Sequence, residues 1–230
     1  MEIKAVLFDL DGTLIDSSEG IIKSALYALS HYGIEEPDTD KLYQFIGPPL
    51  SDSFQKLYGF SPEQAKEAVE VYRESYHKTG IFQCSLYPGV EDCIRLLRQQ
   101  GYRIGLASSK PEESCKRILE HFDILSLFDQ VVGATFDGTR DKKEDVLREV
   151  FRRWEDLSPE EMCLIGDTIF DVEGANLVGM PCIAVTYGFG NLQQMKAAGI
   201  AGCCETAIKL PEQICRLNHS TPGQRGSYHE

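Results

Sequence analysis

The chain of 230 residues lacks an apolar run of the length that a membrane helix needs, about 20 residues. It also lacks the layout of a signal peptide, because Met1-Glu2-Ile3-Lys4 leads directly into a short strand-like run. Both absences argue against a membrane-spanning or secreted protein. We therefore expect a cytoplasmic protein that has no membrane partner.

Positive charge is scarce in this sequence. The 23 lysines and arginines are outnumbered by 36 aspartates and glutamates, which gives a formal net charge of −13 at pH 7. Nucleic acids and anionic membranes are bound through lysine and arginine, so this balance argues against both as partners. A phosphorylated ligand would need local positive groups or a metal ion to hold its phosphate.

Cysteine occurs eight times, but no pair has the C-x-x-C spacing, and the five histidines form no metal-ligand cluster with the cysteines. Cys163 and Cys182 lie inside apolar runs and are expected to be small core residues. Cys203 and Cys204 are adjacent, which is awkward for a disulfide. We interpret the cysteines as buried or inert thiols rather than as a disulfide framework.

Short apolar runs recur along the chain, and each ends at a small or polar residue. They are AVLF before Asp9, IGLA before Ser108, VVGA before Thr135, CLIG before Asp167 and CIAV before Thr186. Runs of this length are typical of strands that are buried on both faces of a parallel sheet. Helical patterns lie between them. The alternation predicts an α/β fold with a doubly wound parallel sheet.

The segment 17–84 is different, because its apolar residues follow helical spacing and it contains no strand-like run. Ser61-Pro62-Glu63-Gln64 has the pattern of a capping box and predicts the start of a helix. We predict a small helical cap domain over 17–84, inserted after the first strand of an α/β core that comprises 1–16 and 85–217. The polar tail 218–230 is expected to be disordered.

Polar side chains follow three of the apolar runs. Asp9 and Asp11 follow the first run, Ser108 follows another and Asp167 a third. Because open α/β sheets bind ligands at the carboxyl ends of their strands, these residues are expected to meet at one edge. Neighbouring carboxylates need a proton or a cation, and oxygen ligands suit Mg²⁺. A carboxylate there can also attack phosphorus while a neighbouring acid transfers protons.

Three motifs resemble those of the haloacid dehalogenase-like phosphatases. They are DLDGTL at Asp9–Leu14, LASSK at Leu106–Lys110 and GDTIFD at Gly166–Asp171. The resemblance extends to about Leu217, includes a helical cap, and is greatest to the phosphoglycolate phosphatase-like branch. It implies a Mg²⁺-dependent phosphatase of small phosphorylated metabolites that works through an aspartyl-phosphate. Asp11 favours phosphoryl transfer, because the dehalogenases lack an acid at that place.

The resemblance also implies a role for each matching position. Asp9 would be the nucleophile and a Mg²⁺ ligand. Asp11 would be the general acid and base and would give the metal its backbone carbonyl. Asp167 would complete the metal site, and Asp171 would orient it from a second layer. The positions implied in phosphate binding are Ser108, Ser109, Gly12, Thr13 and Lys143.

The phosphate-binding lysine of the family often stands in a K-P-x-P setting, which this chain lacks. The candidates are Lys142 and Lys143 in TRDKKEDVL, with Lys110 a more distant third. The spacing after D-G-T-R in relatives of this branch favours Lys143, and Lys142 remains the alternative. Ser109 is a second departure, because phosphoglycolate phosphatases often carry asparagine there. Both departures leave the chemistry in place and the substrate open.

Two loops have alternative interpretations. By resemblance, the cap loop FIGPPL selects substrates through its first four residues, which are Phe45, Ile46, Gly47 and Pro48. Alternatively, it is a turn between helices, with Phe45 and Leu50 in the cap core. The segment YGFG, Tyr187–Gly190, follows the last apolar run and could rim the site or be a plain loop.

The triplet Asp-Gly-Thr of the first motif occurs again in TFDGTRDKKE. Here Thr135 stands where the first copy has the nucleophile Asp9, so the second copy lacks a pair of carboxylates. We interpret Asp137 and Gly138 as turn residues in a loop that brings Lys143 to the site.

Other functions remain open. Within the family they are a β-phosphoglucomutase-like phosphomutase, a 5′-nucleotidase or a pyrophosphatase. A signalling receiver domain also clusters aspartates, but it is much shorter and has no cap. A catalytically inactive binding protein is disfavoured by the presence of Asp9, Asp11 and Asp167. The expected partner is a small phosphorylated metabolite, and the expected state is a monomer or weak homodimer.

Overall fold

The structure is a computed structural model, and it describes residues 2–219. The described residues divide into two compact units. The core unit runs up to Ile15 and continues from Leu86, whereas the cap unit is Asp16–Ser85. The short strands β2 (Ile15–Asp16) and β3 (Ser85–Leu86) form a two-stranded sheet where the chain passes between the units.

Six parallel strands form the sheet of the core unit, in the order β5-β4-β1-β6-β7-β8. Their bounds are β1 Ala5–Phe8, β4 Arg103–Pro111, β5 Gln130–Ala134, β6 Met162–Gly166, β7 Cys182–Val185 and β8 Gly202–Cys204. All five predicted runs are strands, and the four residues of β1 and of β7 are all buried. The predicted α/β fold is confirmed.

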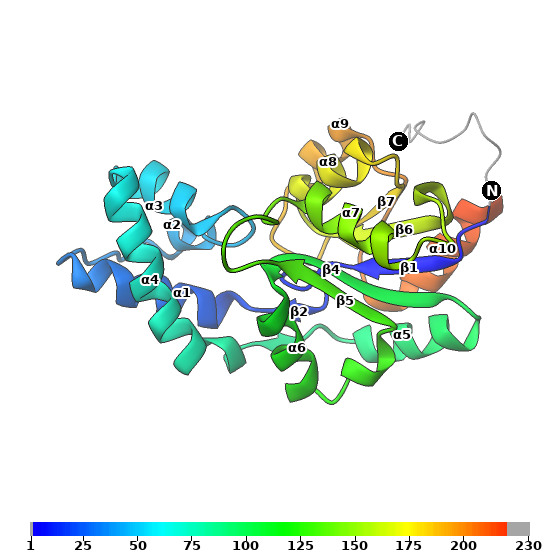
Figure 1. The fold of residues 1–230 in the computed structure, drawn as a ribbon, viewed down its shortest axis with the longest axis horizontal. Helices are drawn as coiled ribbons and strands as arrows, with labels where there is room; N and C mark the ends of the chain where they lie inside the picture. Colours follow the sequence, from blue (N-terminus) through cyan, green and yellow to red (C-terminus); the bar gives the residue numbers. More distant parts are fainter. Residues whose placement is uncertain (1, 220–230) are drawn as a thin grey trace. The chain divides into compact units, whose positions relative to one another are not determined.

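Helices cover both faces of this sheet (Figure 1). On one face lie α7 Lys143–Arg153, α8 Ile169–Leu177 and α9 Leu192–Ala198, and on the other α5 Val90–Gln99, α6 Glu112–His121 and α10 Leu210–His219. Val146 and Val172 of the first set pack with Leu7 of β1 in one buried cluster. Because helices pack their apolar faces on both sides of the sheet, neither face of the strands meets water, which explains their unbroken apolar sequences.

The order of the strands decides where a ligand can bind. The chain passes from β1 to its neighbour β4 and on to β5, and then crosses to β6 on the other side of β1. The loops after β1 and β6 therefore diverge to opposite sides of the same point, which is where open α/β sheets form their binding crevice.

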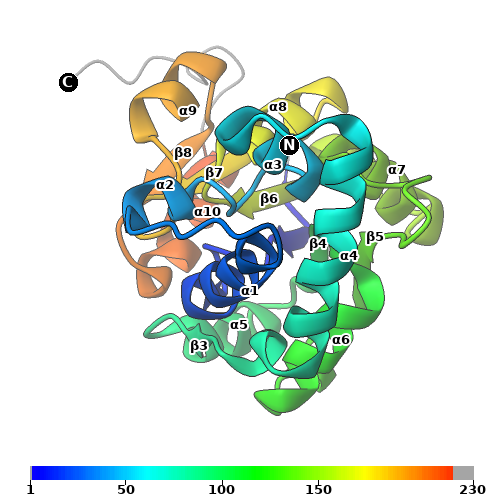
Figure 2. The ribbon, with the colours of Figure 1, turned by 90° about the vertical axis from the view of Figure 1, so that its left-hand side faces the viewer.

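The cap unit is helical and has its own aromatic core. Its helices are α1 Ser18–His31, α2 Thr39–Tyr43, α3 Leu50–Tyr58 and α4 Pro62–Lys78. The predicted capping box starts α4, where the Ser61 hydroxyl accepts from the backbone N–H of Gln64. Figure 2 shows α4 beside α1, and these two helices are in contact. Phe54 stacks on Phe60 with ring centroids 5.7 Å apart.

One detail differs from the expectations. Asn218 and His219 belong to α10 rather than to a disordered tail, and the Asn218 side chain accepts from the backbone N–H of Ile3 at 2.7 Å. The rest of the expected tail, 220–230, lies outside the described residues. All eight cysteines are free thiols, and both Cys163 and Cys182 are buried. No helix in the described part is long and apolar enough to cross a membrane.

Candidate active site

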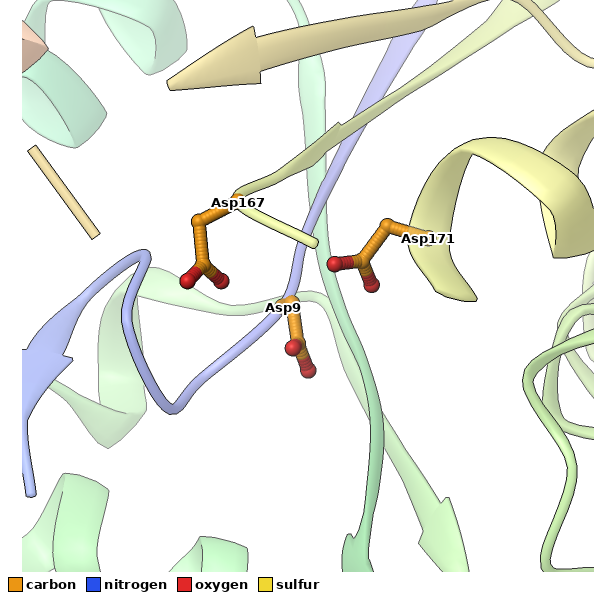
Figure 3. Close-up of side chains that lie close together, drawn as sticks. All are labelled: Asp9, Asp167 and Asp171. Carbon is orange, nitrogen blue, oxygen red and sulfur yellow. The ribbon is translucent and has the colours of Figure 1, made fainter. Parts of the chain in front are cut away.

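Three carboxyl groups meet beside the carboxyl ends of β1 and β6 (Figure 3). Asp9 follows β1, Asp167 follows β6, and Asp171 lies in the first turn of α8. One carboxylate oxygen of each lies within 4.8 Å of the others. Asp167 and Asp171 are fully buried and Asp9 is 9% exposed, so these charges are largely removed from water.

The ammonium group of Lys143 lies beside this cluster and is 5% exposed. Its Nζ is 3.0 Å from Oδ1 of Asp9 and 2.8 Å from Oδ1 of Asp171, and it donates to the carbonyl of Ala107 at 2.8 Å. Burial alone would lower the pKa of Lys143, but the two carboxylates more than offset it and raise that pKa. The lysine is therefore a fixed positive charge inside the protein.

A single ammonium group does not neutralise three carboxylates. Burial raises the pKa of Asp9 to about 6, and the charges of Asp171 and Asp11 act in the same direction, whereas Lys143 opposes them. Burial also raises the pKa of Asp167, reinforced by Asp171 and Asp9. The cluster therefore carries excess negative charge that a cation would relieve.

The donor set fits Mg²⁺. The cluster offers only carboxylate oxygens, which are the hard ligands that this ion prefers, and the described part of the chain brings no cysteine or histidine into it. Asp9, Asp167 and Asp171 would hold the ion with their side chains. The backbone carbonyl of Asp11, which the resemblance implies as a ligand, would add a further hard oxygen donor.

Asp171 has two tasks. Its Oδ1 pairs with Lys143, whereas its Oδ2 accepts from the backbone N–H of Thr168 at 3.0 Å and from the Thr168 hydroxyl at 2.8 Å. The second pair of contacts is the capping box that starts α8. The expected place for Asp171 was a second layer around the metal site. One of its carboxylate oxygens lies within 4.8 Å of oxygens of Asp9 and Asp167, and the role that the resemblance implies for it stays a prediction.

A different lysine pairs with Asp11. The Nζ of Lys110 is 2.8 Å from Oδ2 of Asp11, while Oδ1 of Asp11 is buried without a hydrogen-bond donor among the described residues. The Ser108 hydroxyl accepts from the backbone N–H of Lys110 at 3.3 Å and is buried, within the bounds of β4. Each aspartate of the first motif thus pairs with its own lysine, Asp9 with Lys143 and Asp11 with Lys110. Ser109, which follows the buried Ser108, is exposed.

Gly12 and Thr13 hold Asp167. The Thr13 hydroxyl donates to Oδ1 of Asp167 at 3.2 Å. Gly12 has a positive φ of 78°, and a Cβ there would overlap the Asp167 carboxylate. The backbone N–H groups of both residues donate inside their own turn, to the carbonyls of Ile15 and Leu10. Their observed contacts therefore support a metal ligand, while their implied role in phosphate binding stays a prediction.

The two adjacent lysine candidates differ in position. Lys142 is exposed and is the N-cap of α7, whereas Lys143 is its first residue and pairs with Asp9 and Asp171. The loop before them is a turn, because Oδ1 of Asp137 accepts from the backbone N–H and the hydroxyl of Thr139 at 3.0 and 2.8 Å, and Gly138 has a positive φ.

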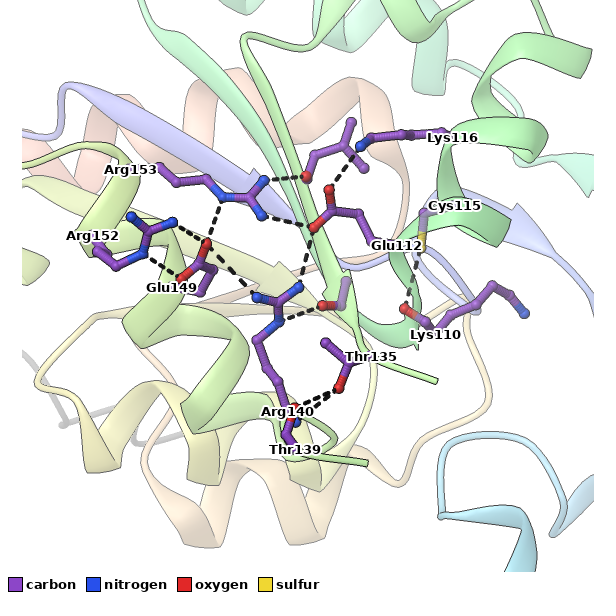
Figure 4. A network of polar contacts seen from close by, with 12 residues as sticks. Lys110, Glu112, Cys115, Lys116, Thr135, Thr139, Arg140, Glu149, Arg152 and Arg153 are labelled. Carbon is purple, nitrogen blue, oxygen red and sulfur yellow. Dashed lines mark hydrogen bonds and ion pairs between the residues drawn. The ribbon is translucent and has the colours of Figure 1, made fainter. Parts of the chain in front are cut away.

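A network of charged groups anchors this loop (Figure 4). Arg140 donates to the carbonyl of Gly133 at 2.8 Å and pairs with Glu112 of α6 at 3.2 Å. Glu112 also pairs with Arg153 of α7 at 2.9 Å, and Arg153 pairs with Glu149 at 2.9 Å. The loop is thereby fixed to α6 and α7, and α7 carries Lys143.

The four cap residues expected to choose substrates differ in burial. Phe45 and Ile46 are buried, and the Phe45 ring lies 4.9 Å from that of Phe54 within the cap unit. Gly47 is exposed and Pro48 is partly buried. The contacts of Phe45 are those of a cap-core residue, which was the alternative interpretation of this loop.

Comparisons with known proteins agree with this architecture. A model of the haloacid dehalogenase-like hydrolase family matches residues 6–185. A 5′-nucleotidase of Pseudomonas aeruginosa is 40% identical over 192 residues, which cover 84% of this chain and 86% of that protein. The tyrosine-protein kinase PtkA of Mycobacterium tuberculosis is 38% identical over 80% of this chain and 62% of the kinase.

A solved structure is also similar. The crystal structure of a predicted phosphatase from Clostridium acetobutylicum has a TM-score of 0.89 and 38% identity to this chain. The match covers 94% of this chain and all of that one.

Replacing Lys143 by methionine should destabilise the metal-free protein. The change leaves Asp9 and Asp171 buried without their cation, which costs about 3–5 kcal/mol in the free energy of unfolding. Urea denaturation at pH 7 with a chelator measures it. Lys142→Met is the matched control and should remain close to wild type, because Lys142 is exposed. Equal stability of the two variants would contradict the pairing.

Binding of Mg²⁺ should weaken at acidic pH. Below a pKa of about 6, Asp9 is protonated in the metal-free protein and must lose its proton to bind a cation. The affinity should then fall by at least about tenfold per pH unit below pH 6, because the raised pKa of Asp167 acts in the same direction. Calorimetric titration between pH 5 and 8 tests this. Asp137→Asn, at an exposed aspartate, should keep the same profile, and constant affinity down to pH 5 would refute it.

Proposed function

The chain belongs to the haloacid dehalogenase-like hydrolases, and we propose that it is a Mg²⁺-dependent phosphatase that hydrolyses small phosphorylated metabolites through an aspartyl-phosphate. The observation that carries the proposal is the buried Asp9 carboxylate, paired with Lys143 and adjacent to Asp167 and Asp171. We further propose that the protein works in the cytoplasm as a monomer or weak homodimer.

The chemistry proceeds in two halves. An oxygen of Asp9 forms a bond to phosphorus, the bond from phosphorus to the ester oxygen breaks, and Asp11 donates a proton to the departing oxygen. Asp11 then takes a proton from a water molecule whose oxygen attacks phosphorus. The bond between phosphorus and Asp9 breaks, which releases inorganic phosphate and restores both carboxyl groups.

Positive groups make this attack possible. The Nζ of Lys143 lies 3.0 Å from Oδ1 of the proposed nucleophile Asp9, so it can stabilise negative charge on the phosphoryl group that Asp9 receives. The Ser108 hydroxyl can donate to the same group. Mg²⁺, held by Asp9, Asp167 and Asp171, would neutralise the remaining charge of the carboxylates and of the phosphate. Lys110 holds the Asp11 side chain in place.

Phosphoglycolate-like phosphomonoesters are the proposed substrates. A nucleoside monophosphate is a second candidate, favoured by the 40% identity to a protein named as a 5′-nucleotidase. Pyrophosphate remains a further alternative. A β-phosphoglucomutase-like activity is distinguished by its requirement for a sugar bisphosphate, because the proposed phosphatase releases phosphate from simple esters without one.

The proposal predicts release of phosphate from at least one member of a panel of phosphoglycolate, nucleoside monophosphates, sugar phosphates and pyrophosphate. Activity should require Mg²⁺ and disappear with a chelator. Asp9→Asn should lower the turnover on the best substrate by at least about a thousandfold, because the amide is a poor nucleophile. Asp137→Asn, in the second Asp-Gly-Thr triplet, should keep its turnover. Wild-type turnover in Asp9→Asn would show that Asp9 is not the nucleophile.

Asp11→Asn should separate the two halves of the reaction. With an alkyl phosphate, turnover should fall by about a hundredfold or more, since the leaving oxygen needs a proton. With p-nitrophenyl phosphate, whose leaving group needs none, the variant should form the phosphoenzyme quickly and hydrolyse it slowly. A burst of p-nitrophenol equivalent to the enzyme concentration is the expected signal. Equal losses on both substrates without a burst would contradict the role of Asp11.

A further inference from the structure

The loop Tyr187–Gly190 follows β7 and packs against Asp167. The backbone N–H of Phe189 donates to Oδ2 of Asp167 at 2.8 Å. Because the Thr13 hydroxyl donates to Oδ1, both oxygens of this carboxylate are held by rigid donors. A carboxylate has about four acceptor positions, so lone pairs remain for a cation. The loop therefore restrains Asp167 without using up its capacity as a ligand.

Two glycines allow the loop to come this close. A Cβ on Gly188 would overlap the carbonyl oxygen of Gly12 and the side chain of Asp167, and a Cβ on Gly190 would overlap the carbonyl oxygen of Asp167. Neither glycine has a positive φ, so close approach and not backbone conformation explains their presence. The backbone of the loop is in direct contact with the backbone and side chain of Asp167.

Tyr187 connects the loop to the turn after β1. Its hydroxyl donates to the carbonyl of Thr13 at 2.9 Å, and its ring lies 4.7 Å from that of Tyr87. The same Thr13 holds Asp167 through its side chain. Hydrogen bonds therefore connect the loops that follow β1, β6 and β7 to one another, through Tyr187, Thr13, Asp167 and Phe189.

We propose that the Tyr187–Gly190 loop is the positioning element of Asp167 and thereby sets the affinity of the site for Mg²⁺. The inference rests on the proposed function for the identity of the ion. Groups that orient a metal ligand change the affinity by about 10–100-fold when they are removed, because the ligand must otherwise be ordered at the moment of binding. The loop acts through Asp167 and does not touch the reacting atoms.

Calorimetric titration of the full chain with Mg²⁺ alone tests this role. Gly188→Ala displaces the loop from Asp167 and should raise the Kd for Mg²⁺ by about 10–100-fold. Tyr187→Phe removes the hydrogen bond to Thr13, which in turn holds Asp167, and should raise the Kd for Mg²⁺ by roughly 3–10-fold. In both variants turnover should return to that of the wild type at saturating Mg²⁺.

Two control variants make the same chemical changes elsewhere in the core unit. Gly105→Ala places a Cβ 2.6 Å from Cδ2 of Leu7 in the middle of the sheet, so it should lower stability and leave the Kd unchanged. Tyr102→Phe removes a hydroxyl that accepts from Asn218 at 3.1 Å, and should also leave the Kd unchanged.

The outcomes separate the two proposals. If the wild type does not bind Mg²⁺, the proposed metal dependence fails and the role of the loop fails with it. If the wild type binds, and Tyr187→Phe and Gly188→Ala bind equally well, the positioning role alone is refuted. If Gly188→Ala does not fold, Tyr187→Phe decides the question. A turnover that saturating Mg²⁺ does not restore would also refute the inference.

Discussion

The ammonium group of Lys143 lies between Asp9 and Asp171 inside the protein, and the remainder of the site depends on that charge. Without it, three carboxylates would share a space from which water is largely removed, and their repulsion would oppose folding. With it, part of that repulsion is offset, and the negative charge that remains favours the binding of a cation. The same group thus makes the cluster compatible with a folded protein and, under the proposed function, would also face the phosphate of the substrate.

Much of the fold could be predicted because its signals are local. Apolar runs bounded by polar residues predicted five strands, and the capping box at Ser61 predicted the start of α4. The sixth strand, β8, is only three residues long, Gly202–Cys204, and such a run has no distinguishing period. Asn218 was assigned to the tail by its polarity, yet its side chain is fixed by a partner more than 200 residues away.

The sequence predicted which residues form the site, but it predicted fewer of the contacts between them. That Asp9 and Asp167 meet follows from strand ends in a parallel sheet. Which lysine faces them follows from the start of α7, since adjacent helical residues point in different directions and only Lys143 points inward. The contact of Phe189 with Asp167 has no signal in the sequence, because every residue except proline carries the same backbone donor.

The central position of β1 has a consequence for how the protein is made. β1 is synthesised first, but one of its two neighbours, β6, begins only at Met162, and the loop that holds Asp167 follows at Tyr187. β1 therefore cannot pair with both of its neighbours until the residues of β6 have been synthesised. Pairings between strands so far apart in the chain form slowly, because a long loop must close first. A chain that ends before β6 lacks both Asp167 and Asp171, so it cannot assemble the three carboxylates.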